Sequence, residues 1–388
     1  MAHAVAASFL APAAAWAGPD CADLVPSGAT FPTRSLVPED LVRLRDIGPV
    51  DPMQQYAGLF SVSPDGRRVA FQLRRGDPAT NRYCLAMVVV ELRPGGKAVV
   101  ADRGGGFIRY RFDFRGKASF PSGVADTITP RWSPDGRWIA YRRRDRDTVQ
   151  LWRARTDGSG SEAITDSVDD VEDFRVTADG NGIVHATRPG LREASAAIDR
   201  EGLSGFHYDD RFSPTSSSRP FPPAPIPRKA WYLDLESRRT RAATQEEAAL
   251  LDEVPREEGS WTQAAGPTGA VAVVQVAPDS LYASRGRLQV AVGARTTVCG
   301  APECADASYP WWAGDAVRFL RREGWRNEET AVYEWKPGSL RTRRLYATVD
   351  LLLGCVPAGA ALTCLREGAL QPPRLERLAA RPAAVWAT

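Results

Sequence analysis

The stretch Pro130–Tyr141, which reads Pro-Arg-Trp-Ser-Pro-Asp-Gly-Arg-Trp-Ile-Ala-Tyr, decides the fold. Pro134 presets φ for the second position of a tight turn, and Gly136 supplies the positive φ that a type I turn with a bulge requires. From Trp138 onward the side chains alternate with the period of two that belongs to a pleated strand. The stretch therefore predicts a β-hairpin. Because a lone hairpin is only marginally stable in water, it also predicts neighbouring strands.

Five further stretches repeat this unit along the chain. Phe60–Leu73 has the same Ser-Pro-Asp-Gly turn, and Phe174–Thr187 has Thr-Ala-Asp-Gly in its place. The weaker copies are Gln263–Val276, Trp311–Arg321 and Leu351–Leu365, each with a glycine in the turn. Three of the five spacings between units lie near the roughly 40–50 residues of a four-stranded propeller blade. The sequence therefore predicts an all-β fold: a β-propeller with six visible blades of the Ser-Pro-Asp-Gly type and room for a seventh.

Little helix is expected, because no 3.6-residue periodicity is sustained along the chain. Glu39–Arg45 has the character of one helical turn, which Gly48 and Pro49 end. The acidic stretch around Gln245–Glu253 is the second place where helix is expected. Outside these two stretches we predict negligible helix.

The chain divides into a leader, a short lead-in and the propeller. Residues 1–17 are apolar and end in Ala15-Trp16-Ala17, which is typical of a secretory signal, although a basic segment at its start is missing. Residues 18–59 lead into the propeller, and residues 60–388 form it, with an insertion at 188–229. No other apolar run reaches membrane-spanning length. We therefore expect an exported, periplasmic protein without membrane insertion.

Composition and motifs exclude several classes of function. The formal net charge of +3 is too small to indicate a nucleic-acid partner. No Gly-x-Ser-x-Gly nucleophile motif occurs, so no catalytic residue is assigned. No Cys-x-x-Cys occurs and the three histidines lie far from the cysteines, so we expect no metal site and no cofactor. His185 lies in an apolar strand and is interpreted as a packed core histidine.

Six cysteines fit an oxidising compartment. Cys355 and Cys364 flank a Pro-Ala-Gly turn, so they are expected to face one another across a hairpin. Cys299 and Cys304 bracket a loop short enough to close on itself. By elimination, the remaining bond would join Cys21, in the lead-in, to Cys84 of the first blade.

The insertion at 188–229 is the largest departure from the repeat. Long loops inside a compact repeat fold are usually functional or disordered. Its second half is rich in Ser and Pro and is expected to be extended, whereas Gly205–Phe212 combines aromatic and charged side chains. These residues could simply cap their own blade; alternatively, they could bind substrate. The candidate substrate-binding residues are His207, Tyr208, Asp209, Arg211 and Phe212.

The hairpin turns resemble those of TolB-like propellers and of the propeller domains of prolyl oligopeptidase and dipeptidyl peptidase IV-like enzymes. A more specific resemblance lies near the start of the chain. The stretches Leu41–Gly48, Phe60–Arg75 and Asn81–Cys84, with Asp77-Pro78, resemble the lasso peptide isopeptidases, exported relatives of prolyl oligopeptidase. Gly205–Phe212 also resembles part of that family's propeller insertion.

The resemblance implies a function and a partner. In that family a propeller precedes an α/β-hydrolase domain that carries Ser, Asp and His and cuts the isopeptide bond of threaded lasso peptides. Pro372–Leu378 resembles the last propeller strand before the hydrolase, and the sequence reaches only Thr388, so we expect the C-terminal catalytic domain to be absent. The expected role is a propeller that binds and gates a lasso peptide substrate. The alternative is a TolB-like propeller that binds protein partners at the cell envelope without chemistry.

Overall fold

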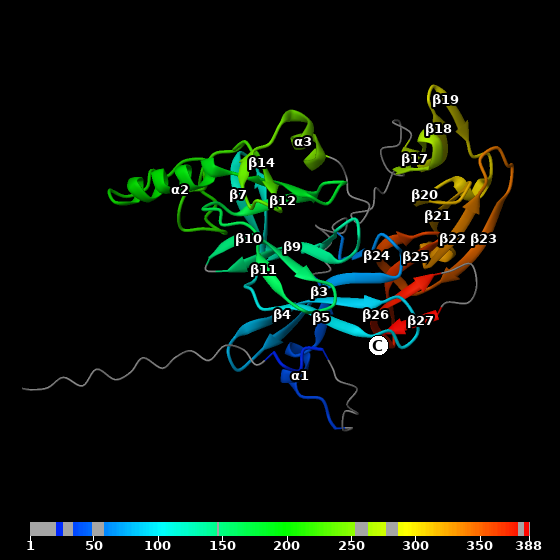
Figure 1. The fold of residues 1–388 in the computed structure, drawn as a ribbon, viewed down its shortest axis with the longest axis horizontal. Coiled ribbons are helices and arrows are strands. Elements are labelled where there is room, and N and C mark those ends of the chain that lie inside the picture. Colours follow the sequence, from blue (N-terminus) through cyan, green and yellow to red (C-terminus); the bar gives the residue numbers. More distant parts are fainter. Residues whose placement is uncertain are drawn as a thin grey trace, which may run out of the picture.

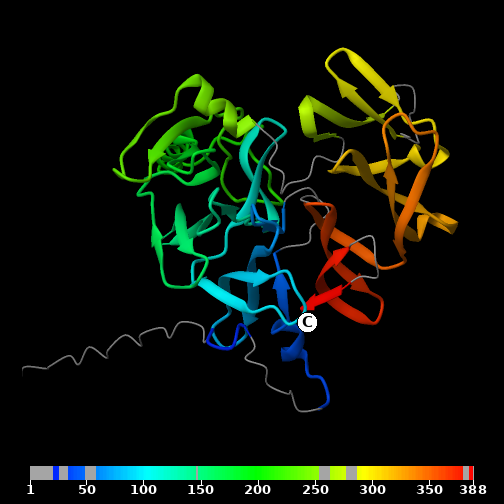
Figure 2. The same ribbon diagram turned by 45° about the vertical axis from the view of Figure 1, so that its right-hand side comes forward.

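The sheets of this protein follow one another around a common centre. The computed structural model describes residues 21–25, 34–48, 58–145, 147–252, 263–276, 286–378 and 384–387. Within them six antiparallel sheets of four or five strands succeed one another along the chain, with one extra two-stranded sheet. The last sheet, drawn in red, lies beside the first, drawn in blue to cyan (Figures 1 and 2). The fold is a β-propeller, as the sequence predicts, while the number of blades stays a prediction.

The first three sheets hold the strands up to residue 242. Sheet 1 contains β1 (Arg45–Ile47), β2 (Phe60–Val62), β3 (Arg68–Asp77), β4 (Arg82–Glu91) and β5 (Ala98–Arg103). The two-stranded hairpin contains β6 (Arg109–Phe114) and β7 (Lys117–Ala125). Sheet 2 contains β8 (Arg131–Trp132), β9 (Trp138–Asp145), β10 (Thr148–Arg155) and β11 (Ser161–Ala163). Sheet 3 contains β12 (Val171–Val176), β13 (Gly182–Thr187), β14 (Lys229–Asp234) and β15 (Thr240–Ala242).

The remaining three sheets are four-stranded meanders without insertions of comparable size. Sheet 4 contains β16 (Gln263–Ala265), β17 (Ala270–Val276), β18 (Gly286–Val292) and β19 (Arg295–Val298). Sheet 5 contains β20 (Ala307–Ala313), β21 (Ala316–Glu323), β22 (Glu329–Trp335) and β23 (Thr342–Thr348). Sheet 6 contains β24 (Leu351–Ala358), β25 (Ala361–Gly368), β26 (Gln371–Leu378) and β27 (Ala384–Ala387).

The repeated turns share one hydrogen-bond pattern. In the second turn the Ser133 hydroxyl donates to Asp135 Oδ1 at 2.7 Å, and the third turn repeats the bond from Thr177 to Asp179 at 2.6 Å. Gly180 has a φ of 73°, and a Cβ at this position would lie 3.0 Å from Cδ of Pro134 in the preceding turn. Glycine is required there both for its backbone conformation and for this close approach. The turn motif thus also packs consecutive sheets together.

Hydrophobic clusters join consecutive sheets of the ring. Ala70 and Met87 of sheet 1 pack with Ile139 of sheet 2, and similar clusters join sheets 2 and 3, 4 and 5, and 5 and 6. Phe60 of sheet 1 and Leu365 of sheet 6 belong to one buried cluster, so the first and last sheets also pack together. Within the described residues no such cluster joins sheet 3 to sheet 4.

Helix is more extensive than the sequence predicts. α1 (Pro38–Val42) and α3 (Gln245–Ala249) lie in the two stretches where helix is expected, but the prediction of negligible helix elsewhere is wrong. The insertion begins with α2 (Pro189–Gly202), a helix of 14 residues. Leu191, Ala194 and Ile198 carry a helical spacing that the neighbouring Ser- and Pro-rich sequence obscured, and Pro189 suits the first helical position. Short 3₁₀ turns are η2 (Leu250–Asp252), η4 (Pro267–Gly269), η5 (Pro302–Cys304) and η6 (Trp325–Asn327).

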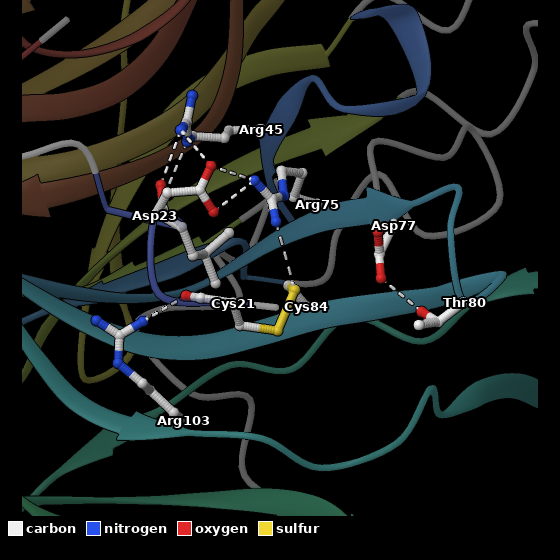
Figure 3. The surroundings of a disulfide bond; sticks show 9 residues. Cys21, Asp23, Arg45, Arg75, Asp77, Thr80, Cys84 and Arg103 are labelled. Atoms are coloured by element: carbon white, nitrogen blue, oxygen red, sulfur yellow. Dashed lines mark hydrogen bonds and ion pairs between the residues drawn. A yellow bond between two sulfur atoms is a disulfide. The ribbon is translucent and has the colours of Figure 1, made fainter. Parts of the chain in front are cut away.

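The three disulfides join the pairs that the sequence predicts: Cys21–Cys84, Cys299–Cys304 and Cys355–Cys364. Figure 3 shows the first of them, which fastens the lead-in to sheet 1. Beside it, both carboxylate oxygens of Asp23 accept from Arg75 at 2.6 Å, and Arg103 donates to the carbonyl of Cys21 at 2.8 Å. The predicted signal at residues 1–17 lies outside the described residues.

Candidate functional site

A cavity of about 990 Å³ lies where the hairpin β6–β7 meets sheets 2 and 3 and the insertion. Its wall is formed by β6 and β7, the strands β8, β9 and β12, residues 147–149 at the start of β10, the loop 168–170 and the first half of α2. Residues 216, 217, 219–222 and Arg228 complete it. The hairpin is held over it by backbone bonds: Ala118 N–H donates to the Pro222 carbonyl at 2.7 Å, and Ala224 N–H donates to the Gly116 carbonyl at 2.8 Å. The two insertions into the repeat therefore together build the cavity.

Strand alternation decides which side chains reach the cavity. Arg142 and Arg144 are two residues apart on β9, and both line it. Arg143, between them, does not line it; it donates to Asp102 of sheet 1 at 2.8 Å. Arg109 and Arg111 are likewise two residues apart on β6 and line the cavity. The period of two on both strands thus gives this wall its arginines.

Most of the charged residues in the wall form ion pairs. Arg142 pairs with Asp126 at 2.6 Å, and Arg188 pairs with Glu172 at 2.6 Å. Further pairs join Arg192 to Asp169 at 2.9 Å, Arg228 to Glu172 at 3.4 Å and Arg131 to Asp173 at 3.8 Å. Burial lowers the pKa of Arg142, but the adjoining carboxylate of Asp126 outweighs this effect and raises it above the ordinary value. These ion pairs fix the positions of sheets 2 and 3 and the insertion relative to one another around the cavity.

Arg109, Arg111 and Arg144 differ from these, because none of the three forms an ion pair within the described residues. Arg111 donates to the Ser119 carbonyl at 3.1 Å, and Arg144 donates to the Asp147 carbonyl at 2.9 Å. Partial burial lowers the pKa of Arg111, and the positive charges of Arg109 and Arg144 lower it further. The cavity therefore has one patch of positive charge without a bound carboxylate.

The five substrate-binding residues expected from the sequence lie elsewhere. None of them lines the cavity; the segment folds against the end of α2. Arg211 donates to both oxygens of Glu201 at 2.8 Å and to Asp209 at 2.9 Å, and the His207 N–H donates to Glu201 at 3.0 Å. Tyr208 stacks on Phe212 with ring centroids 5.0 Å apart and is 73% exposed. Binding by these residues stays a proposal, which the exposed ring of Tyr208 supports best.

Sequence reasoning did not identify the arginines of the cavity. Their signal was present as Arg-x-Arg on β6 and β9, a pattern that places both guanidinium groups on one face of a strand. It was hidden because arginine is abundant throughout the chain, and because the segment that becomes β6 and β7 carries no Ser-Pro-Asp-Gly turn.

His185 is 2% exposed, which confirms it as a core histidine, and burial lowers its pKa to about 4.

The described residues contain neither a cluster of metal ligands nor a membrane-spanning helix. No group of three or more His, Cys, Asp or Glu side chains is arranged there to hold a metal ion. No helix of the described part is both long and apolar enough to cross a membrane.

Comparison with known proteins gives the relationship. No family model matches the chain. It is 37% identical over 350 residues to the lasso peptide isopeptidase AtxE2 of Asticcacaulis excentricus, a match that covers 88% of this chain and 49% of the relative. This chain is homologous to a lasso peptide isopeptidase.

Solved structures of the AtxE2 isopeptidase agree with this relationship. A variant with Astexin3-dC4 bound superposes with a TM-score of 0.83 at 35% identity, over 92% of this chain and 54% of that one. The apo form gives a TM-score of 0.82 at 35% identity, over 91% and 53%. The chain thus spans about half the length of the isopeptidase, and the matched half is the propeller.

Proposed function

We propose that this chain is the substrate-binding and gating propeller of a periplasmic serine peptidase of the lasso peptide isopeptidase type. The observation that carries the proposal is the match to AtxE2 with Astexin3-dC4 bound, which extends over 92% of this chain. On this proposal the propeller holds a threaded peptide, and a hydrolase domain of the kind found in prolyl oligopeptidase relatives cuts its isopeptide bond. No catalytic residue is assigned to the present chain.

The cavity is the proposed binding surface. Ligand pockets in proteins usually enclose about 300–1,000 Å³, so a cavity of about 990 Å³ is large enough for part of a folded peptide. The hairpin β6–β7 and the insertion form its rim, and their mutual backbone bonds fix the size of the opening. We propose that this rim gates access by shape, and that the exposed Tyr208 adds a secondary contact outside the cavity.

The proposed periplasmic location has two supports. The apolar residues 1–17 have the pattern of a secretory signal. Three disulfides, one of which ties Cys21 to Cys84, are typical of proteins in oxidising compartments.

The test is a calorimetric titration of the full chain with threaded Astexin3-dC4 and with a linear peptide of the same sequence. We expect the threaded form to bind more tightly, because a preorganised peptide loses less conformational entropy on binding. Ser195→Trp, which fills the cavity from α2, should abolish this binding. Ala197→Trp is the matched control, because Ala197 is exposed on the same helix and does not line the cavity. Equal affinity for both peptides, or no effect of Ser195→Trp, would favour the TolB-like alternative.

A further inference from the structure

We propose that Arg109, Arg111 and Arg144 form a subsite in the cavity wall that binds a carboxylate of the peptide ligand. The peptide nature of the ligand rests on the proposed function, whereas the subsite itself rests on the positions and charges of these three side chains. Nothing in the relationship to the isopeptidases assigns such a role.

Backbone hydrogen bonds bring the two strands that carry the arginines together. The Gly106 N–H, just before β6, donates to the Arg144 carbonyl on β9 at 2.7 Å. The Asp126 N–H, just after β7, donates to the Ile108 carbonyl at 2.8 Å, which fixes the start of β6 beside the Asp126–Arg142 pair. All three side chains line the cavity, and the charges of Arg109 and Arg144 act on Arg111, so the three arginines share one region of the wall.

The charges in this region are not balanced. Asp147 and Asp170 also line the cavity, and the charge of Asp170 acts on Arg111, but neither forms an ion pair with the three arginines. One oxygen of Asp170 already accepts from the Val149 N–H at 2.8 Å. Like charges held together without an ion-paired carboxylate raise the energy of the empty site, so an anion that enters reduces this repulsion. Burial is the main cause that lowers the pKa of Arg111, and the charges of Arg109 and Arg144 lower it further.

The donors that remain match a carboxylate. A guanidinium has five N–H donors in a planar fork, and it binds carboxylates through two parallel bonds. Arg111 and Arg144 each donate to one neutral carbonyl, and within the described residues the side chain of Arg109 makes no hydrogen bond. In a peptide, the groups that meet this need are the C-terminal carboxylate and the side chains of Asp and Glu.

The experiment titrates the full chain with three threaded probes. They are Astexin3-dC4, its C-terminal amide, and a form whose free Asp and Glu side chains are replaced by Asn and Gln. Arg111→Gln should weaken binding of Astexin3-dC4 about tenfold, as expected for loss of a charge-assisted hydrogen bond. Arg111→Lys should recover only part of the affinity, because it keeps the charge but loses the fork. Arg137→Gln is the control for net charge, since Arg137 lies in an exposed turn outside the cavity.

The outcomes separate the two proposals. If one of the two modified probes binds the wild type about tenfold more weakly and is insensitive to Arg111→Gln, the subsite is supported and the source of the carboxylate is identified. If all three probes bind the wild type and Arg111→Gln equally well, the subsite is overturned while the proposed function stands. If no threaded probe binds the wild type, the proposed function is overturned and the peptide subsite with it.

Discussion

Arg211 and Arg111 show how differently one residue type behaves in two regions of this molecule. Arg211 lies between the carboxylates of Glu201 and Asp209, whose hydrogen bonds raise its pKa above the ordinary value. Arg111 lines the cavity together with Arg109 and Arg144, and its pKa is lowered by burial and by their positive charges. The charge of Arg211 is already neutralised within its own segment, so it contributes to structure. Arg111 forms no ion pair within the described part of the chain, so its charge is available to a ligand.

This comparison shows what a stretch of sequence alone can indicate about a binding site. An aromatic and charged stretch such as Gly205–Phe212 stands out in a sequence, but its opposite charges are close enough along the chain to satisfy one another. A site for an anion instead needs charges whose partners are missing, and only the arrangement of strands far apart in sequence shows this.

The comparison predicts the largest loss of stability where a paired arginine loses its carboxylate. Asp126→Asn removes the partner of Arg142, and the two side chains are only 15% and 17% exposed. We expect the free energy of unfolding in urea to fall by about 2 kcal/mol, somewhat below the loss for a fully buried pair. Asp147→Asn is the control, because the exposed Asp147 lines the same cavity and forms no ion pair with any residue that the structure describes. An equal loss in the control would remove the distinction between paired and unpaired wall residues.

A smaller and pH-dependent effect is expected at the end of α2. The hydrogen bond from Arg211 is the main cause that lowers the pKa of Glu201 from 4.5 to about 2. A carboxyl whose pKa is lowered in the folded state stabilises the protein above its unfolded pKa and loses this contribution as the pH falls. The stability difference between the wild type and Glu201→Gln should therefore shrink between pH 4.5 and about 2. Thermal melts at each pH measure it, with Glu193→Gln of the same helix as the control. A difference that does not change with pH would show that Arg211 is not held by Glu201.

The smallest change in stability is expected for Arg111→Gln. The substitution removes one of three like charges and a single bond to a carbonyl, so the two effects oppose one another. Urea unfolding should differ from the wild type by no more than about 0.5 kcal/mol. A loss as large as that of Asp126→Asn would mean that Arg111 is a structural residue, and the carboxylate subsite would lose its basis.

The sequence predicts the repeated elements well and the insertions poorly. The turn at Ser133–Gly136 and its copies predict their hairpins because proline, aspartate and glycine act locally on the backbone. The three disulfides follow from local spacing and elimination. The helix α2 was missed because its signal spans 14 residues among loop-like neighbours, and the hairpin β6–β7 because it lacks the repeat's turn. The cavity exists only where these two insertions meet, which no local pattern encodes.

Hydrogen exchange of the full chain with and without threaded Astexin3-dC4 tests the central claim most directly. The claim is that the ligand binds in the cavity beside Arg109, Arg111 and Arg144, for which the described ranges provide no ion-paired carboxylate. We expect the largest slowing of exchange in β6, Arg109–Phe114, and around Thr148–Val149, with a weaker effect near Tyr208. Slowing confined to Gly205–Phe212, with β6 unchanged, would contradict the account. It would indicate that the ligand binds at Gly205–Phe212, beside the end of α2, and not in the cavity.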